Sequence, residues 1–454
     1  MQFDPSIFKD YDVRGHYPQQ INAEVFEAIA RELVDHFKPK IISIGRDVRL
    51  GSEELQEAMM RGFSESGVSV VDLGIITTDM INFAGGFYGY DLNVMITGSH
   101  AEKENGFKIC QKGALPVSGL SDLYQIRDAL LKKEKWLLGE KPGGVIQKNI
   151  LSDWIKHAFR FVDLAKVKKY KVVVDTGNGV AGILLADVEK RLPGEFINLF
   201  PELDGNFPHH FPNPLVEKNL ESLKKAIADN QADFGLAFDA DGDRVFLVDE
   251  KLRFVDGTIL TAMVSKSLLQ KFPGEIVQYN AVCGRIVPET IQTYGCRPIR
   301  VRVGYSLIKE AMIKNNAIFT GEHSGHFFFR DNYFSDSGLI MALTVLELIS
   351  QDGRKLAQIV DDFAIYSQSG EINFVVQNKA KMMKIMEEKY HRTAESIDWL
   401  DGVSIWFKDW WLNLRPSNTE SLLRLNIEAD NQEILAVKTR EIKEELWQNG
   451  AVLK

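Results

Sequence analysis

Four short polar segments of this chain combine residue types that could carry out chemistry. The first contains Ser99, which follows the apolar run 94–96 and precedes His100. Ligands bind where the strands of open α/β sheets end, and a serine hydroxyl needs a base or a charge nearby to become a nucleophile. Lys108 follows after an Asn105-Gly106 turn that could fold its amine back towards Ser99. The segment predicts a reactive serine, although a polar turn without chemistry would have the same pattern.

The second segment carries three alternating carboxylates directly after an apolar run, at Asp239, Asp241 and Asp243. Gly242 lets the loop curl, so that all three can face one hard cation. Oxygen-only ligands with three negative charges suit Mg²⁺, and a phosphate oxygen can complete the shell. An EF-hand calcium loop begins in the same way, but its sixth position, here Arg244, must be glycine and helices must flank it. The segment therefore predicts a magnesium site.

The third segment, residues 321–326, places Glu322 and Ser324 beside two imidazoles, His323 and His326, between apolar runs. Two acceptors and two imidazoles in a short turn suit the hydroxyl groups of a sugar. A metal site formed by Glu322 and the two histidines is the alternative. The sugar site is favoured because one compact turn rarely aims three ligands at one point.

The fourth segment offers a guanidinium, two hydroxyls and an amide in one turn, with a second arginine, Arg424, shortly after it. Its polar residues are Arg415, Ser417, Asn418, Thr419 and Glu420. Such donors, together with backbone N–H groups, form a phosphate clamp. A polar turn without a binding role is the alternative, and the presence of Arg424 makes the phosphate clamp the favoured interpretation.

The composition excludes several classes of protein. A chain of 454 residues has room for three or four domains at about 150 residues each. The net charge of −9 argues against a nucleic-acid partner, which requires a basic face. Three cysteines without metal-type spacing fit a reducing cytoplasm. The N-terminal residues do not form a signal peptide, and the most apolar helical run, 339–349, is too short to span a membrane.

Strand and helix patterns alternate along most of the chain, which indicates layered α/β structure. Strand patterns occur at 41–44, 68–73, 93–96, 171–175, 196–200, 233–238, 275–279 and 299–303. After about residue 365 the pattern changes to hairpin-like strands with a long last helix over 432–448. We expect three similar mixed α/β domains over 1–144, 145–250 and 251–365, followed by an α+β domain over 366–454.

Residues 177–182 match the G-x-G-x-x-G pattern of dinucleotide-binding folds, after a strand pattern. Glu202 and Asp204 lie at about the right distance to bind a ribose. An NAD-dependent oxidoreductase is therefore a competing hypothesis. It is disfavoured because the first βαβ unit normally carries this pattern, and because the four polar segments would have no role.

Taken together, these segments resemble the α-D-phosphohexomutases, of the phosphomannomutase/phosphoglucomutase type, over the whole chain. The matching segments are 8–15, 45–50, 97–100, 105–108, 174–182, 204–208, 239–244, 303–304, 321–326 and 415–420. The resemblance implies four domains around a central cleft, with one key loop from each. It also implies that residues 177–182 are a structural turn.

The resemblance implies a mechanism in which Ser99 carries a phosphoryl group and exchanges it with a hexose phosphate through a hexose 1,6-bisphosphate, which also serves as activator. The implied Mg²⁺ ligands are Asp239, Asp241, Asp243 and the phosphorylated Ser99. The implied catalytic residues are Ser99, His100, Arg14, Lys108 and Arg244. The implied substrate contacts are Tyr11, Tyr305, Glu322, Ser324, His326, Arg415, Ser417, Asn418, Thr419 and Arg424. The expected protein is a cytoplasmic monomer or homodimer that acts on mannose phosphates and also on glucose phosphates.

Four residues depart from the family pattern. Ala101-Glu102 stands where relatives have asparagine and proline, Tyr305 where they often have histidine, and Ser421 where they have proline. These changes leave a catalytically impaired, sugar-phosphate-binding relative as an alternative. A phosphoglucomutase or a phosphoglucosamine mutase of the same family is another.

Overall fold

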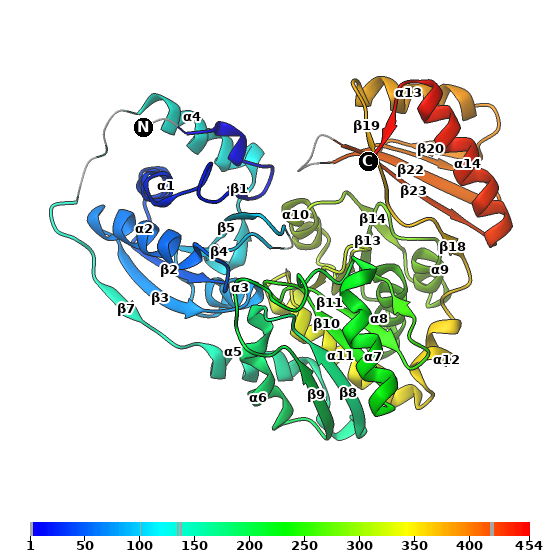
Figure 1. The fold of residues 1–454 in the computed structure, drawn as a ribbon, viewed down its shortest axis with the longest axis horizontal. Helices are drawn as coiled ribbons and strands as arrows, with labels where there is room; N and C mark the ends of the chain where they lie inside the picture. Colours follow the sequence, from blue (N-terminus) through cyan, green and yellow to red (C-terminus); the bar gives the residue numbers. More distant parts are fainter. Residues whose placement is uncertain (1–2, 100, 134–135, 137–138, 418–421) are drawn as a thin grey trace.

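The computed structural model describes residues 3–99, 101–133, 136, 139–417 and 422–454. Its strands form four sheets, one for each of four domains that follow one another along the chain (Figure 1). The first three sheets mix parallel and antiparallel pairs, and the fourth is antiparallel throughout its described pairs. The predicted fold class, three mixed α/β domains followed by an α+β domain, is confirmed.

The first domain contains a seven-stranded sheet in the order β1-β5-β4-β2-β3-β7, with β6 paired to β5. Its elements are β1 (Val13–His16), α1 (Ala23–Phe37), β2 (Ile41–Arg46), α2 (Ser52–Glu65), β3 (Ser69–Ile75), α3 (Thr78–Phe87), β4 (Leu92–Ile96), β5 (Glu104–Gln111), β6 (Leu115–Pro116), α4 (Tyr124–Lys132) and β7 (Val145–Gln147). Apolar residues recur on the inner face of α1, and Asn22 caps its first turn by accepting a hydrogen bond from the Val25 amide.

The second domain has a five-stranded sheet in the order β12-β11-β10-β8-β9. Its elements are α5 (Leu151–Ala158), β8 (Tyr170–Asp175), α6 (Leu185–Glu189), β9 (Gly194–Leu199), α7 (Glu221–Asn230), β10 (Phe234–Phe238), β11 (Val245–Asp249) and β12 (Phe254–Val255). Strands β10 and β11 are buried at every position, as expected for apolar runs covered on both faces.

The third domain has a five-stranded sheet in the order β14-β13-β15-β16-β17. Its elements are α8 (Gly257–Lys271), β13 (Val277–Asn280), α9 (Ile286–Thr293), β14 (Ile299–Val301), α10 (Tyr305–Asn315), β15 (Phe319–Gly321), β16 (Phe327–Phe329), β17 (Ser335–Asp336), α11 (Gly338–Asp352) and α12 (Leu356–Asp361). Helix α11 is apolar on all sides and nearly all of its residues are buried.

The fourth domain has the sheet order β20-β21-β22-β23-β19-β24, with β18 paired to β23. Its elements are β18 (Ser367–Gln368), β19 (Ile372–Val375), α13 (Lys379–Tyr390), β20 (Ser396–Asp398), β21 (Val403–Trp406), β22 (Trp410–Pro416), β23 (Leu422–Ala429), α14 (Gln432–Gln448) and β24 (Val452–Leu453). In Figure 1 helices α13 and α14 lie against one face of this sheet. No helix of the described chain is long and apolar enough to cross a membrane.

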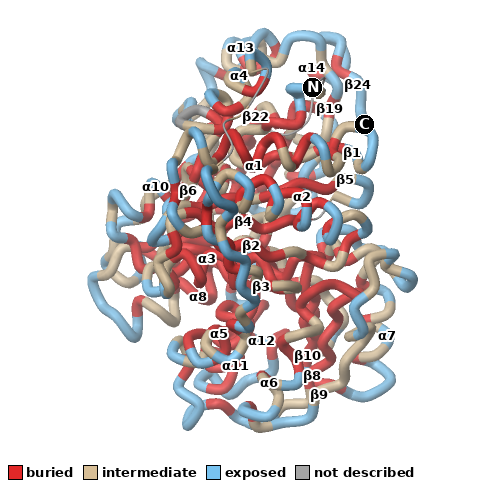
Figure 2. The backbone as a smooth tube through the Cα atoms, turned by 90° about the vertical axis from the view of Figure 1, so that its left-hand side faces the viewer, coloured by how far each residue is buried: buried red, intermediate tan, exposed pale blue. Residues whose placement is uncertain are grey.

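One apolar core extends from the first domain through the second and third. It joins residues as distant in sequence as Val71, Trp154, Phe234 and Phe319. The fourth domain has a separate core under its own sheet. Figure 2 shows the buried strands β2, β4, β8 and β10 running through the interior of the molecule. The first three domains therefore share a packed interior, and the fourth does not contribute to it.

Each of the four predicted chemical segments connects the two strands of an antiparallel hairpin. The hairpins are β4–β5, β10–β11, β15–β16 and β22–β23. The predicted turn at Asn105-Gly106 is wrong, because both residues lie within β5. The chain reverses before β5, and antiparallel pairing places Lys108 opposite Met95 on β4.

Phe107 tests how far the first hairpin depends on its core. Its ring is fully buried and packs edge-on against Phe26. Phe107→Ala should lower the free energy of unfolding of the first domain by about 3–5 kcal/mol, because it leaves a cavity in a close-packed interior. Hydrogen exchange of the β4 and β5 amides measures this loss. Phe87→Ala is the matched control, since Phe87 is 54% exposed, and an equal loss in both variants would contradict the prediction.

Candidate active site

Ser99 lies just beyond the end of β4 in a backbone conformation that serine rarely adopts. Its φ of 50° lies in the left-handed region, which costs a residue with a side chain roughly 1–2 kcal/mol. The Ser99 amide donates a hydrogen bond to Thr97 Oγ1 at 2.8 Å, and the residue is only 2% exposed. Contacts with its surroundings must therefore hold this conformation. His100, predicted to be catalytic, lies outside the described residues.

The three aspartates of the second segment form a single buried cluster. Their side chains are wholly buried, and one oxygen of each lies within 4.8 Å of the others. The turn depends on Gly242, whose φ of 74° is left-handed. Like charges this close repel strongly in a protein interior, so the cluster requires cations.

Lys108 supplies one of these cations from the first domain. Its Nζ donates to Asp241 Oδ2 at 2.8 Å and to Asp243 Oδ2 at 2.6 Å. Arg244 supplies another, since its Nε donates to Asp239 Oδ2 at 2.7 Å. Lys108 therefore binds Asp241 and Asp243, and Arg244 binds Asp239.

Burial and these ion pairs set the protonation of the cluster. Burial opposes the negative charge of Asp241, but Lys108 outweighs it and holds the pKa of Asp241 well below its usual value. Burial also opposes the charge of Lys108, but Asp241 and Asp243 raise its pKa above the ordinary value. Asp239 behaves differently, because burial outweighs Arg244 and raises its pKa to about 7.

Two oxygens of the cluster are available to a cation. Asp241 Oδ1 and Asp243 Oδ1 are buried and accept no hydrogen bond from the described residues. Buried polar atoms without a protein partner are rare and usually bind a water molecule or an ion. Oxygen-only donors that are crowded and incompletely neutralised fit a hard divalent cation. The donor set therefore matches the metal site predicted from the sequence.

The first domain contacts this cluster a second time through the start of α3. The hydroxyl of Thr78 donates to Asp241 Oδ2 at 2.7 Å, and its amide donates to the Asp241 carbonyl at 2.9 Å. The next residue, Asp79, accepts a hydrogen bond from Ser337 Oγ of the third domain at 2.6 Å. Sequence reasoning missed these residues, because their polar types are unremarkable in a helix start.

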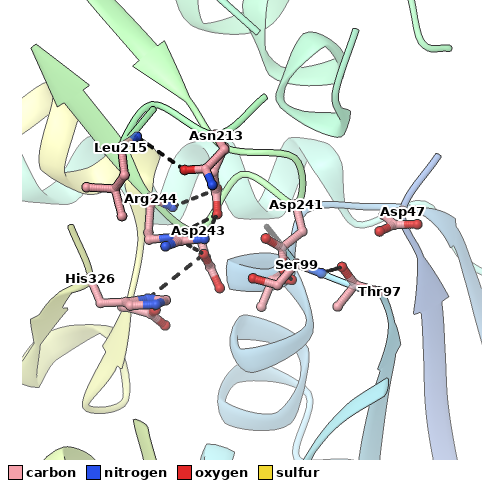
Figure 3. Close-up of polar contacts among 12 residues, drawn as sticks. Asp47, Thr97, Ser99, Asn213, Leu215, Asp241, Asp243, Arg244 and His326 are labelled. Atoms are coloured by element: carbon pink, nitrogen blue, oxygen red, sulfur yellow. Dashed lines mark hydrogen bonds and ion pairs between the residues drawn. The ribbon is translucent and has the colours of Figure 1, made fainter. Parts of the chain in front are cut away.

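His326 brings the third segment to the aspartate cluster (Figure 3). Its Nδ1 lies 2.6 Å from Asp336 Oδ2 and 3.9 Å from Asp243 Oδ1. Asp336 is wholly buried and was not expected from the sequence, because it stands in β17 outside any motif. The alternative metal site of Glu322, His323 and His326 is not among the groups that converge in the described structure.

The sugar-binding candidates lie in the same turn. Glu322 is 3% exposed, and its Oε1 accepts a hydrogen bond from Asn280 Nδ2 at 3.1 Å. Burial raises the pKa of Glu322. Ser324 is half-buried. His323 faces elsewhere, since its Nδ1 lies 3.0 Å from Thr258 Oγ1.

The phosphate-binding candidates lie on the β22–β23 hairpin of the fourth domain. Arg415 and Arg424 are direct cross-strand neighbours, and both pair with Glu371, at 3.2 and 3.4 Å. Glu371 thus holds the two guanidinium groups side by side on the hairpin. The amide of Ser417 donates to the Leu422 carbonyl at 2.8 Å. Asn418 and Thr419 lie outside the described residues.

The remaining candidates are Arg14 and Tyr11 of the first domain and Tyr305 of the third. Arg14, on β1, stands opposite Gly106 of β5 and pairs with Asp12 at 2.5 Å. Tyr11 lies beside the backbone of Gly304, the residue before Tyr305. Burial raises the pKa of Tyr305 well above its ordinary value.

The G-x-G-x-x-G segment packs against protein on its glycine faces. A Cβ on Gly177 would lie 2.8 Å from Pro212 Cβ, and one on Gly182 would lie 2.2 Å from the Pro201 carbonyl oxygen. The glycines thus allow close packing of the loop that follows β9, as in a structural turn.

Comparison with known proteins gives matches along the whole chain. Family models described as phosphoglucomutase/phosphomannomutase match in order: alpha/beta/alpha domain I at 5–135, domain II at 152–253, domain III at 256–366 and the C-terminal domain at 371–445. A protein of Xanthomonas campestris pv. campestris (strain B100) named "Phosphohexose mutases" is 36% identical, covering 96% of this chain and 98% of that one. A phosphomannomutase of Salmonella montevideo is 35% identical, with coverage of 96% and 98%.

The fold has a similarly close match among solved structures. The crystal structure of a phosphoglucomutase/phosphomannomutase family protein from Burkholderia thailandensis superposes with a TM-score of 0.90 at 27% identity. The match covers all of both chains.

The cluster predicts stabilisation by Mg²⁺. After dialysis against EDTA, added Mg²⁺ should raise the melting temperature. At a Mg²⁺ concentration about 100 times the dissociation constant, the free energy of unfolding should increase by about 2.7 kcal/mol. Asp241→Asn should abolish the shift, because it removes a charged ligand. Asp229→Asn, an exposed site on α7 paired only with Lys225 among its described ion pairs, should keep it. An undiminished shift in Asp241→Asn would rule out this cation site.

Proposed function

Because this chain belongs to the phosphoglucomutase/phosphomannomutase family of isomerases, we propose that it interconverts mannose 1-phosphate and mannose 6-phosphate, and also the glucose phosphates. One observation carries the proposal. Lys108, on the hairpin that presents Ser99, bridges two carboxylates of the buried aspartate cluster. The hairpin that would carry the nucleophile thus contacts the turn that would hold the metal.

In the proposed reaction Ser99 Oγ carries a phosphoryl group and transfers it to a hydroxyl of the bound hexose monophosphate. The P–O bond to serine breaks as the bond to the sugar oxygen forms, and the proton of the sugar hydroxyl is transferred to Ser99 Oγ, which gives a hexose 1,6-bisphosphate and a free serine. After the sugar turns in the site, Ser99 takes the other phosphoryl group, and the isomeric monophosphate leaves. A free hexose 1,6-bisphosphate would serve as activator by phosphorylating Ser99.

The charged residues would stabilise the transferring group. Asp239, Asp241 and Asp243, together with the phosphorylated Ser99, would hold Mg²⁺, which offsets negative charge during phosphoryl transfer. Arg14, Lys108 and Arg244 would add positive charge around the same phosphate, as electrostatic stabilisation of this step requires.

The third and fourth domains would hold the sugar and its non-reacting phosphate. Glu322 and Ser324 are the acceptors for the sugar hydroxyls, with His326 beside them. Arg415, Arg424 and Ser417 would bind the phosphate, since the two arginines are cross-strand neighbours on the hairpin that also carries Ser417. Asn418 and Thr419 stay predicted contacts. A cytoplasmic location and a monomeric or dimeric state complete the proposal.

Ser99 is the first test. With a hexose bisphosphate, intact-mass measurement should show one added phosphate on the parent and none on Ser99→Ala, because the variant lacks the accepting oxygen. Mutase turnover should fall to background in the same variant. Ser66→Ala, at the C-terminal end of α2, is the control and should behave as the parent. If the parent is phosphorylated but shows no mutase turnover, the protein is better explained as a catalytically impaired relative. Full activity in Ser99→Ala would rule out the covalent mechanism.

Specificity is the second test. Turning the ring end for end roughly exchanges its 3- and 4-hydroxyls, so one pair of acceptors can serve both poses. Mannose and glucose differ only at C2, where Glu322 and Ser324 should make no contact. The kcat/KM values for the two 1-phosphates should therefore differ by no more than the roughly 10–200-fold that fit alone provides. Glu322→Gln should lower both by a similar factor, about 10- to 100-fold for a hydrogen bond to a charged group. A preference of roughly 10⁴ would reveal a contact to the 2-hydroxyl.

A further inference from the structure

One buried arginine, Arg49, holds the backbone of the serine segment. It stands beyond β2 and is 6% exposed. Its guanidinium donates hydrogen bonds to the carbonyl oxygens of Ser99 and Ala101, and to that of Glu104 at 3.3 Å. These carbonyls lie at and after the residue with the left-handed backbone. A single side chain therefore spans the segment that presents the Ser99 hydroxyl.

Arg49 is itself fixed by a wholly buried carboxylate. Its Nε donates to Asp47 Oδ2 at 3.1 Å, and its amide donates to Asp47 Oδ1 at 3.0 Å. Ser52 Oγ donates to the same Oδ1 at 2.6 Å. The Asp47 amide in turn donates to the carbonyl of Ile96, the last residue of β4, at 2.9 Å. Asp47 and Arg49 therefore form one network that begins and ends on the serine hairpin.

A loop of the second domain packs against this network. The rings of Phe207 and Phe211 lie 5.7 and 5.3 Å from the Arg49 guanidinium carbon, within range of cation–π attraction. Gly205 packs so closely on the same turn that a Cβ there would lie 2.2 Å from the Val48 carbonyl oxygen. The loop that carries these residues belongs to the domain that carries the aspartate cluster. Arg49 is thus sandwiched between the serine segment and the metal-type domain.

We propose that Arg49 is the positioning residue that sets Ser99 relative to the aspartate cluster, through the backbone of the serine segment and the aromatic pair Phe207–Phe211. Within the described chain, its side-chain hydrogen bonds all go to Asp47 and to backbone carbonyls of the serine segment, so it would act through Ser99 and not by binding the substrate. The inference rests on the proposed function, because it assigns Arg49 a role in phosphoryl transfer by Ser99. Arg14, Lys108 and Arg244 would act on the reacting group itself.

Arg49→Lys is the decisive variant, because lysine keeps the charge but cannot span three carbonyls with a planar fork. We expect kcat to fall by about 100-fold, the loss typical of a reacting group misplaced by roughly 1 Å. KM for the hexose phosphate should stay within about threefold, since the sugar and phosphate contacts lie on other domains. Hydrogen exchange of the amides at 99–105 should accelerate, while that of β10 and β11 stays unchanged.

Arg46→Lys is the matched control, because the side chain of Arg46, the last residue of β2, makes no hydrogen bond with the described residues of the serine segment. It pairs with the exposed Glu53 at 3.0 Å and donates to the Asp47 carbonyl. Its kcat should stay within about twofold of the parent, because lysine keeps the charge and an ion pair with an exposed partner contributes little. If Arg49→Lys does not fold, Phe207→Leu combined with Phe211→Leu keeps the guanidinium and removes its aromatic cover. This variant should lose kcat, with KM unchanged.

The outcomes separate the two claims. No turnover by the parent, with hexose bisphosphate and Mg²⁺ present, overturns the proposed function and the inference with it. If the parent is active and Arg49→Lys has the same kcat, the inference alone is overturned. The inference is also overturned if Arg49→Lys raises KM but leaves kcat unchanged. A loss confined to kcat, with faster exchange at 99–105, supports the positioning role.

Discussion

Three wholly buried carboxylates in one six-residue turn are the constraint on which the rest of this structure depends. Two unit charges at about 4 Å repel by roughly 4 kcal/mol at an effective dielectric of about 20. The turn can provide one counter-ion of its own, Arg244. The charges of Asp241 and Asp243 must be balanced from elsewhere, and Lys108 of the first domain contributes one positive charge that both carboxylates share. The electrostatics of one turn thus require the docking of two domains.

The same constraint explains why an apolar core joins the first three domains, whereas the fourth has only its own. Lys108 and Thr78 must hold their positions against the aspartate turn. Thr78 opens the helix that places Met80 and Ile81 in the shared core, and Lys108 lies between Phe107 and Ile109 of a second core in the first domain. The fourth domain is joined to the third largely by polar contacts, among them Arg285–Glu428 and Arg300–Asp398. Its arginines would bind the non-reacting end of the substrate, where small displacements cost less than at the reacting phosphate.

The sequence predicted the parts of the site that are local. Alternating aspartates after an apolar run identify their own turn, and the resemblance over the whole chain correctly implied four domains of this family. Residues that join the site only through tertiary contacts could not be predicted in this way. Asp336 and Glu371 belong to no motif, and only the structure shows that they pair with His326 and Arg415. The misplaced turn at Asn105-Gly106 has the same origin. That dipeptide is a turn signal, but its pairing with β1 and the neighbouring pairing of β5 with β4 override the local preference.

The environment of Tyr305 shows what this departure from the family pattern does to the protonation of the site. Burial raises the pKa of Tyr305 well above 10, and burial also lowers the pKa of its neighbour Lys309 to about 8. Near neutral pH the phenol is therefore uncharged and keeps its proton, so it can donate a hydrogen bond but cannot exchange protons as an imidazole would. Positive charge at the junction comes from Lys108, which Asp241 and Asp243 keep protonated, and from Arg14 and Arg244, which are permanently charged. Tyr305 therefore adds a hydrogen-bond donor to the junction and neither a charge nor an acid–base group that titrates near neutral pH.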